Sequence, residues 1–205
     1  MAPKTKEQFA QIRQRSQQAI LDAALSLFAE KGYFATSISM IAKEAGVSKG
    51  LMYNYYGGKE DLLRAIIYDA VETGENWMNE EMSTQASPEE HLIHIVELMI
   101  HQIKENPRYW RLMTSLAFQR EALAPIMLEI EDKKEKTMEM SAELFRSMGY
   151  EDPMTEALFF GATLDGIMMQ FLAIGDEYPM DTMKEHLIKR FCHRGNPFDT
   201  KTNKK

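Results

Sequence analysis

The residues with the clearest chemistry lie in one short stretch, GVSKGLMYNYYGGKEDL, at positions 46–62. Ser48 offers a hydroxyl, and the free backbone N–H groups of a helix that begins there could bind a phosphate. Lys49 could pair with a phosphate or donate to guanine. Gly50 carries no side chain and would let the helix sit close to its partner. Together these features fit contact with a polyanion.

The side chains that follow add further hydrogen-bonding groups. Tyr53 and Tyr55 supply phenol donors at the height of a phosphate, and Asn54 could read adenine if its amide faces a base. Lys59 comes at the start of the next helix, where it could contact a phosphate backbone. The alternative for this stretch is an ordinary turn whose tyrosines pack in a core.

These side chains need a scaffold, and the spacing upstream of them predicts one. Thr36 or Ser37 can cap a helix of about two turns with its hydroxyl. Gly46 then permits a tight turn, and a second short helix begins at Ser48. Because Ala42 lies four positions before Gly46, the two helices can cross closely. This is the spacing of a helix-turn-helix, whose second helix enters the major groove of DNA.

The run from about Ile20 to Leu63, ILDAALSLFAEKGYFATSISMIAKEAGVSKGLMYNYYGGKEDLL, resembles the N-terminal domain of the tetracycline-repressor (TetR) family. The resemblance implies an all-helical homodimer with a three-helix DNA-binding head and a larger body that usually binds a small effector. Asn54 stands where the family often has histidine, which leaves the operator sequence open. By resemblance, the positions that commonly touch DNA are Thr36, Ser37, Ser48, Lys49, Tyr53, Tyr55 and Lys59.

Helical periodicity runs through almost every segment of the chain, and no alternating strand pattern is present. The sequence therefore predicts an all-α protein of about nine helices. We expect a helix-turn-helix DNA-binding domain at residues 1–60 and a helical effector-binding and dimerisation domain at residues 61–205.

Charge and composition narrow the class of protein. The formal net charge is -7, but residues 1–60 hold eight Lys/Arg and five Asp/Glu, which gives +3 there and -10 in the remainder. A basic head on an acidic body favours a local contact with a polyanion. The single cysteine, Cys192, excludes an internal disulfide and fits a reducing compartment. The polar N-terminus lacks the apolar core of a secretory signal, so we expect a cytoplasmic protein.

The helix expected over residues 153–175 is apolar on two sides. One stripe contains Phe160 and Leu164, and the opposite stripe contains Leu158 and Ala162. A helix of this kind must be covered on both sides, and a second copy of the chain is the simplest cover for one of them. Within this helix, the apolar run over residues 158–175 barely reaches the length of a membrane span and contains Asp165 and Gln170, so we expect no membrane partner. The predicted dimer seam consists of Leu158, Ala162, Met169, Leu172, Leu187 and Phe191.

The 16 methionines have two interpretations. Methionine is flexible and polarizable, so it can fill a core or line a pocket for an apolar effector. Asp165, inside an apolar run, could bond within the dimer seam or meet a polar group of a ligand. The pocket interpretation would use Met99, Trp110, Met113, Phe118, Met138, Phe145, Phe160 and Met168.

Catalytic and metal-binding patterns are weak or missing. No glycine loop that could cradle a phosphate and no nucleophile–base constellation is present, so we expect neither an enzyme nor a cofactor. His91, His94 and His101 share one predicted helix, but without nearby cysteine or a placed carboxylate they do not define a metal site.

The predicted function is therefore a dimeric DNA-binding transcription regulator, most simply a repressor. A small, largely apolar effector would release it from a palindromic operator. One alternative is a helix-turn-helix dimer that a protein partner controls. The other is a helical small-molecule carrier, or a membrane-surface protein, that does not bind DNA.

Overall fold

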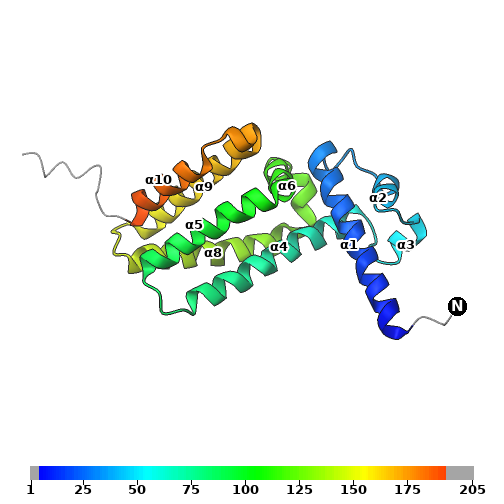
Figure 1. Cartoon of the computed structure of the whole chain (residues 1–205), viewed down its shortest axis with the longest axis horizontal. Coiled ribbons are helices and arrows are strands. Elements are labelled where there is room, and N and C mark those ends of the chain that lie inside the picture. The colour runs from blue at the N-terminus through cyan, green and yellow to red at the C-terminus, as the bar shows by residue number, and fades with distance from the viewer. Residues whose placement is uncertain (1–4, 193–205) are drawn as a thin grey trace, which may run out of the picture. The chain divides into compact units, whose positions relative to one another are not determined.

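A computed structural model describes residues 5–192, except for the side chains of residues 120, 125, 127–130 and 134. Every regular element within the described residues is helical, which confirms the predicted all-α fold (Figure 1). The elements are α1 (Lys6–Lys31), α2 (Ile38–Glu44), α3 (Lys49–Tyr53), α4 (Lys59–Met82), α5 (Pro88–Glu105), α6 (Pro107–Ala117), α7 (Arg120–Leu123), η1 (Ala124–Ile126), α8 (Met127–Ser147), α9 (Pro153–Ile174), η2 (Gly175–Glu177) and α10 (Met180–Cys192). The sequence-based count of about nine missed the single turn α7.

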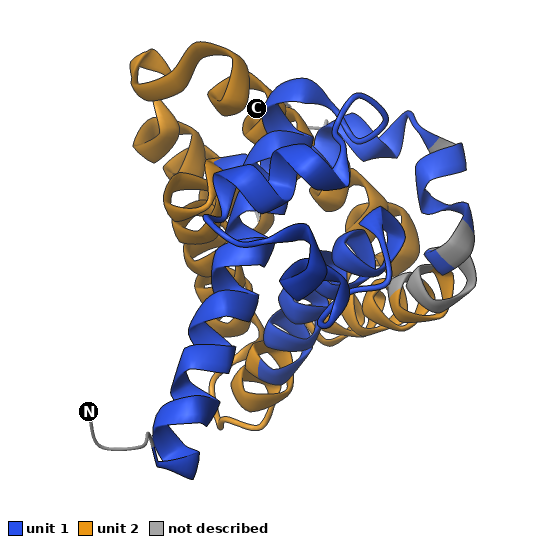
Figure 2. Cartoon of the chain, turned by 90° about the vertical axis from the view of Figure 1, so that its right-hand side faces the viewer, with its two compact units in different colours: residues 1–76, 108–128 blue, residues 77–107, 129–205 orange. Residues whose placement is uncertain are grey.

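The chain divides into two compact units, which Figure 2 shows in different colours. The first, here called the head unit, comprises residues 1–76 and 108–128; the second, the body unit, comprises residues 77–107 and 129–205. Helix α4 therefore begins in the head unit and ends in the body unit. The domain boundary expected after residue 60 stays a prediction.

The head unit is built on α1, which contacts α2, while α2 contacts α3. Ile20 and Phe28 of α1, Ile41 of α2 and Met52 of α3 are all fully buried. The helix starts follow from capping hydroxyls: Ser37 Oγ accepts the Met40 N–H at 3.3 Å. Between α2 and α3 the chain turns sharply at Gly46, whose φ of 67° is strained for any other residue. The buried face thus fixes how α3 is held.

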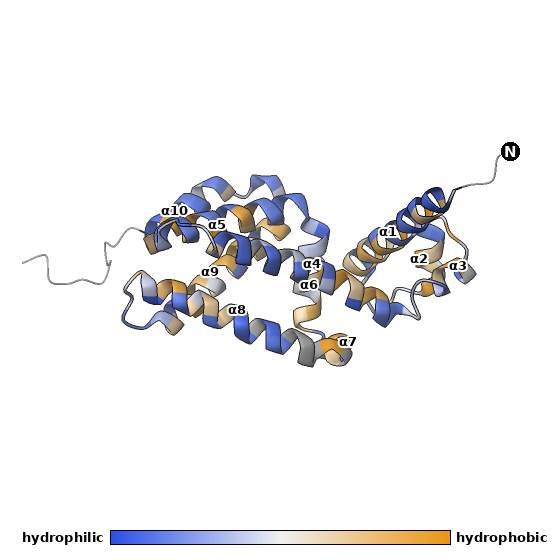
Figure 3. Ribbon diagram, turned by 90° about the horizontal axis from the view of Figure 1, so that it is seen from below, coloured by the Kyte–Doolittle hydropathy of each residue, from blue (hydrophilic) through white to orange (hydrophobic). Residues whose placement is uncertain are grey.

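The body unit has an aromatic core. The ring centres of Phe145, Phe160 and Phe191 lie 5.2–5.7 Å apart in edge-on or tilted arrangements, which aromatic quadrupoles favour. Helix α10 lies beside α5 and α9, and the Tyr150 hydroxyl donates to the Phe191 carbonyl at 2.8 Å. Figure 3 shows hydrophilic and hydrophobic residues interleaved along the helices, as one-sided burial requires.

By length and composition alone, the segment Pro153–Glu177 could cross a membrane, with a mean hydropathy of 1.6. Only 28% of this window is buried within the chain. A core helix of a soluble protein passes the same test, so this finding is weak evidence for a membrane. It does show that most of this segment is not buried by the rest of the chain.

Thr36 provides a test of the head. Its side chain is 1% exposed, and the hydroxyl lies 2.9 Å from the Gly32 carbonyl oxygen and 3.1 Å from that of Leu27. Thr36→Val should lower the free energy of unfolding by about 1–2 kcal/mol, because the buried carbonyls lose their donor. Urea denaturation measures this. The control Thr73→Val removes an exposed hydroxyl that donates to the Asp69 carbonyl and should have little effect. Equal midpoints for wild type and Thr36→Val would contradict the prediction.

Candidate functional site

Helix α3 presents one polar edge to solvent. Its only buried residue is Met52, which is fully covered and anchors the helix in the head core. Ser48 Oγ accepts the Leu51 N–H at 3.1 Å and so caps the first turn. Tyr53 is 55% exposed. The exposed predicted contacts on or beside α3 are Ser48, Lys49, Gly50, Tyr53 and Asn54. Hydroxyl, ammonium, phenol and amide groups on one short helix can serve the phosphates and base edges of a duplex.

Two other predicted DNA contacts, Thr36 and Lys59, form hydrogen bonds within the head unit. Thr36 is buried against the Gly32 and Leu27 carbonyls, so its expected contact with DNA is wrong. The Lys59 ammonium donates to the carbonyls of Tyr33, at 2.9 Å, and Phe34, at 3.3 Å. The same ammonium lies 4.8 Å from the centre of the Tyr33 ring. These contacts tie the start of α4 to the loop after α1.

Ser37 and Tyr55, the other two predicted DNA contacts, lie in different surroundings. Ser37 is exposed and caps α2 through the Met40 N–H. Tyr55 is half-buried, and the Arg13 guanidinium lies 5.5 Å from the centre of its ring. Sequence reasoning counted Arg13 among the basic residues of the head but predicted no contact for it. The available signal was spacing, because Arg13 is seven positions before the buried Ile20 and shares its face of α1.

Helix α9 divides as its two stripes predict. Phe160 and Leu164 are buried on one side, whereas Leu158 is 53% and Met169 is 47% exposed on the other. Ala162 lies on the same exposed side. The outer face of α9, defined here as Leu158, Ala162, Asp165, Met169 and Leu172, is therefore open in a single copy of the chain. Asp165 belongs to this face and lines neither of the pockets described below.

The predicted seam residues of α10 are placed differently. Leu187 is 3% and Phe191 is 1% exposed, and Phe191 is part of the aromatic core of the body unit. Their own chain already covers them, so their assignment to a dimer seam is wrong.

A small apolar pocket lies in the body unit, with a volume of about 30 Å³. That is room for about one water molecule, whereas ligand pockets usually hold about 300–1,000 Å³. Of the predicted effector residues, Phe145 and Phe160 line it. Sequence reasoning missed the rest of the lining, although the i, i+4 pair Met78 and Met82 was a signal. The missed residues are Met78, Met82, Leu92, Ile95, Thr137, Met140, Ser141 and Leu144.

The other predicted effector residues do not line this pocket. Phe118 is 82% exposed, and Trp110, Met113 and Phe118 belong to the head unit. The Trp110 Nε1 atom is buried and has no hydrogen-bond partner among the described residues. Met99, Met138 and Met168 belong to the body unit but do not line this pocket. Six of the eight predicted residues therefore do not line this pocket, and their role in effector binding stays a prediction.

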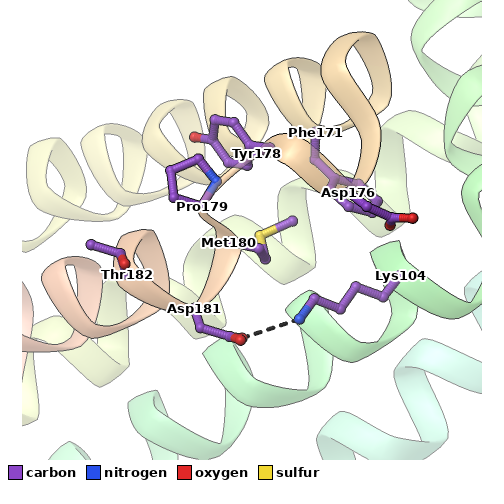
Figure 4. A pocket seen from close by; sticks show the side chains of 8 residues that line it. All are labelled: Lys104, Phe171, Asp176, Tyr178, Pro179, Met180, Asp181 and Thr182. Atoms are coloured by element: carbon purple, nitrogen blue, oxygen red, sulfur yellow. Dashed lines mark hydrogen bonds and ion pairs between the residues drawn. The ribbon is translucent and has the colours of Figure 1, made fainter.

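A more open pocket of about 310 Å³ lies where η2 leads into α10 (Figure 4). Its walls include Tyr178, which is 8% exposed, together with Lys104, Asp176 and Asp181. The Lys104 ammonium donates to an Asp181 carboxylate oxygen at 3.1 Å, and this bond holds the pKa of Asp181 below its usual value. Sequence reasoning did not foresee this pocket.

Glu81 at the end of α4 faces two histidines of α5. Its Oε1 atom lies 3.0 Å from His91 Nδ1 and 2.8 Å from His94 Nδ1. The hydrogen bond to Glu81 raises the pKa of His94 above 6.5. Burial raises the pKa of Glu81, but the bonds from His94 and His91 outweigh burial and leave that pKa lowered. In the part of the chain that the structure describes, no group of three or more His, Cys, Asp or Glu could hold a metal ion.

These shifts predict how stability depends on pH. The contribution of His94 is present below pH 6.5 and is lost as the pH rises through its raised pKa. The contribution of Glu81 is present above pH 4.5 and is lost as the pH falls through its lowered pKa. We expect the Glu81→Gln variant to lose less stability than wild type as the pH rises from 6.5 through the raised pKa of His94. Urea unfolding of wild type and of Glu81→Gln at several pH values measures how the stability of each protein changes with pH. Equal slopes for the two proteins would refute an interaction between Glu81 and His94.

Comparisons with known proteins agree with this arrangement. The family model described as "Bacterial regulatory proteins, tetR family" matches residues 20–66, which run from α1 to the start of α4. The HTH-type transcriptional regulator AcrR of Shigella flexneri is 31% identical over 189 residues, covering 84% of this chain and 83% of that protein.

Other relatives match the head more closely. The HTH-type transcriptional regulator HbdR of Aromatoleum sp. (strain CIB) is 40% identical over 77 residues, or 38% of this chain. The fatty acid metabolism regulator protein of Bacillus subtilis is 35% identical over 77 residues, again 38% of this chain. The match spans only 34% and 40% of the length of these two relatives.

Solved structures share the fold over most of the chain. A putative transcriptional regulator from Saccharomonospora viridis, solved with choline, has a TM-score of 0.74 and 24% identity, and the match covers 90% of this chain and 97% of that one. The regulator FadR from Bacillus subtilis, solved with stearoyl-CoA, has a TM-score of 0.70 and 19% identity over 86% and 98%.

The match of residues 20–66 to that family model and the similarity to AcrR place the chain in the class of bacterial regulatory proteins with a helix-turn-helix. Within that class, the chain belongs to the TetR family.

Proposed function

We propose that the chain is a homodimeric DNA-binding transcription regulator, and that it is a repressor which a small, largely apolar effector releases from a palindromic operator. The observation that carries this proposal is the polar edge of α3. Met52 anchors that helix in the head core while Lys49 and Tyr53 face solvent. A regulator of this kind works where the DNA is, in the cytoplasm.

The proposed DNA contact uses the part of the sequence-based set that is exposed. Ser37 and Ser48 cap α2 and α3 and lie beside phosphates, and Lys49 and Tyr53 contact phosphates or base edges. Asn54 reads a base from the end of α3. Two heads related by a twofold axis suit half-sites about 10 bp apart or a multiple of that spacing.

The proposed dimer seam is the outer face of α9. The exposed Leu158 and Met169 would lose contact with water when a second copy covers them. A Cβ atom added at Gly161 or Gly166 would meet no atom of the chain within 4 Å, so small residues leave room for a close helix. Asp165, on the same face, would bond within the seam.

The proposed effector enters the apolar pocket of the body unit. Its methionines are flexible, so the pocket of about 30 Å³ could open around an apolar ligand. Names among the similar proteins and structures fit this chemistry: the fatty acid metabolism regulator protein of Bacillus subtilis, and the structure of FadR from the same species with stearoyl-CoA. Because α4 carries Met78 and Met82 and begins in the head unit, its movement would transmit binding. Only an effector with different affinities for the two states can drive release.

A second candidate function keeps the DNA-binding dimer but assigns control to a protein partner. The small volume of the apolar pocket favours it, since no effector-sized space is present there.

Selection of bound fragments from the DNA of the source genome tests the proposal. We expect palindromic fragments, and we expect an acyl-chain ligand series to weaken binding to them as chain length increases. Binding that persists unchanged at saturating ligand would favour control by a protein partner. Failure to bind any fragment at low salt would refute the regulator itself.

A further inference from the structure

The first half of α1 extends beyond the core of the head. The buried residues of this helix begin at Ile20, and the family model also begins at residue 20. Residues Lys6–Ala19, here called the α1 arm, include no buried side chain. The fold of the head therefore does not explain these turns of helix.

The α1 arm is nevertheless a defined helix. Thr5 forms a capping box with Gln8: Thr5 Oγ1 accepts the Gln8 N–H at 3.2 Å, and Gln8 Oε1 accepts the Thr5 N–H at 3.0 Å. At 1.5 Å per residue the arm extends α1 by about 21 Å. A second observation fixes its place, because Arg13 lies over the ring of Tyr55, directly after α3.

The composition of the arm suits a polyanion. It holds three basic residues and one acidic residue, within a chain whose net charge is -7. Its remaining polar side chains are mostly amides, which can donate to phosphate oxygens. These amides are Gln8, Gln11, Gln14, Gln17 and Gln18.

One face of the arm continues toward α3. This face consists of Lys6, Phe9 and Arg13, which are three and four positions apart. It is the same face of α1 on which the buried Ile20 lies. Arg15 lies roughly 200° around the helix from Arg13 and so points away. The side chain of Phe9, on the same face as Arg13, is 59% exposed. Through Arg13, this face meets Tyr55, which follows the exposed end of α3.

We propose that the α1 arm is a second DNA-binding surface, which lies along the phosphate backbone beside the site that α3 reads. Lys6 and Arg13 pair with phosphates, and Phe9 packs against the sugar edge between them. The arm adds affinity without sequence preference, because backbone contacts carry no base information. This inference rests on the proposed DNA-binding function.

Two matched variants of the full-length protein test the arm. Arg13→Gln and Arg15→Gln remove the same charge from opposite sides of one exposed helix. Affinity is measured by fluorescence anisotropy between 50 and 300 mM salt, on a selected genomic fragment and on an unrelated duplex. For a dimer, Arg13→Gln should reduce the slope of log K against log salt by about 2, at roughly 0.9 per lost phosphate contact. It should weaken both duplexes equally, and Arg15→Gln should stay near wild type.

The other outcomes are distinct. If wild type binds DNA but Arg13→Gln matches Arg15→Gln, the arm inference fails and the proposed function stands. A loss confined to the genomic fragment would mean that Arg13 only positions Tyr55, which also overturns the inference. If Phe9→Ala changes self-association and not DNA affinity, the face joins copies of the chain instead. Absence of wild-type binding to either duplex at low salt would overturn both proposals.

Discussion

The Met169→Glu variant is expected to be a monomer at micromolar concentration and to bind a palindromic site on the order of 100-fold more weakly than wild type. Met169 is 47% exposed in one copy and lies on the outer face of α9, which we propose as the seam. A twofold axis would bring two uncompensated carboxylates into that seam, next to the Asp165 residues of both copies. Burial of unpaired charge is strongly unfavourable, and a single head loses the effective concentration that the second head supplies.

Sedimentation equilibrium and light scattering measure the first effect, and anisotropy on a two-half-site duplex measures the second. His101→Glu is the matched control, because it adds the same charge at an exposed position of α5. The helical circular dichroism of both variants should match wild type. If Met169→Glu remains dimeric at micromolar concentration, the outer face of α9 is not the dimer seam.

The second large effect concerns α3. Lys49→Ala combined with Tyr53→Ala should weaken operator binding roughly 100-fold or more, since each of the two heads loses contacts worth about 1–3 kcal/mol. Both side chains are exposed, and the residue that buries α3 in the head core is Met52. The urea midpoint should therefore stay at the wild-type value.

The control for this variant is Lys31→Ala, which removes an exposed lysine at the far end of α1. We expect it to change operator affinity little. Unchanged affinity in the double variant, with DNA binding intact in wild type, would show that another element reads the operator.

The head could be predicted from the sequence because its signals are local. Ser37 and Ser48 cap helices through N–H groups three residues away, and Gly46 has the positive φ that its turn requires. The sequence did not predict that Thr36 is buried, because a hydroxyl near a helix start can either accept from an N–H of the following helix or donate to a carbonyl of the preceding one. Its partners, the Gly32 and Leu27 carbonyls, lie at the end of the preceding helix.

The body was harder because periodicity predicts a face and does not predict what covers it. The stripe of α10 that holds Leu187 and Phe191 has the same spacing whether its own chain or a partner buries it. Glu81 could not be matched with His94 either, because they lie on different helices, 13 positions apart. The lining of the pocket depends on which helix faces meet in space. Residue type alone therefore predicted few of the lining residues.

Hydroxyl-radical footprinting of the wild-type protein on a selected genomic fragment, with guanine N7 methylation interference, tests most directly whether paired heads place α3 in major grooves. We expect two protected half-sites on one side of the duplex, with centres about 10 bp apart or a multiple of that spacing. Methylation of N7, which lies in the major groove, should block binding at both, and Lys49→Ala with Tyr53→Ala should abolish protection. A single protected site, or protection that N7 methylation does not disturb, would contradict binding by two heads through α3.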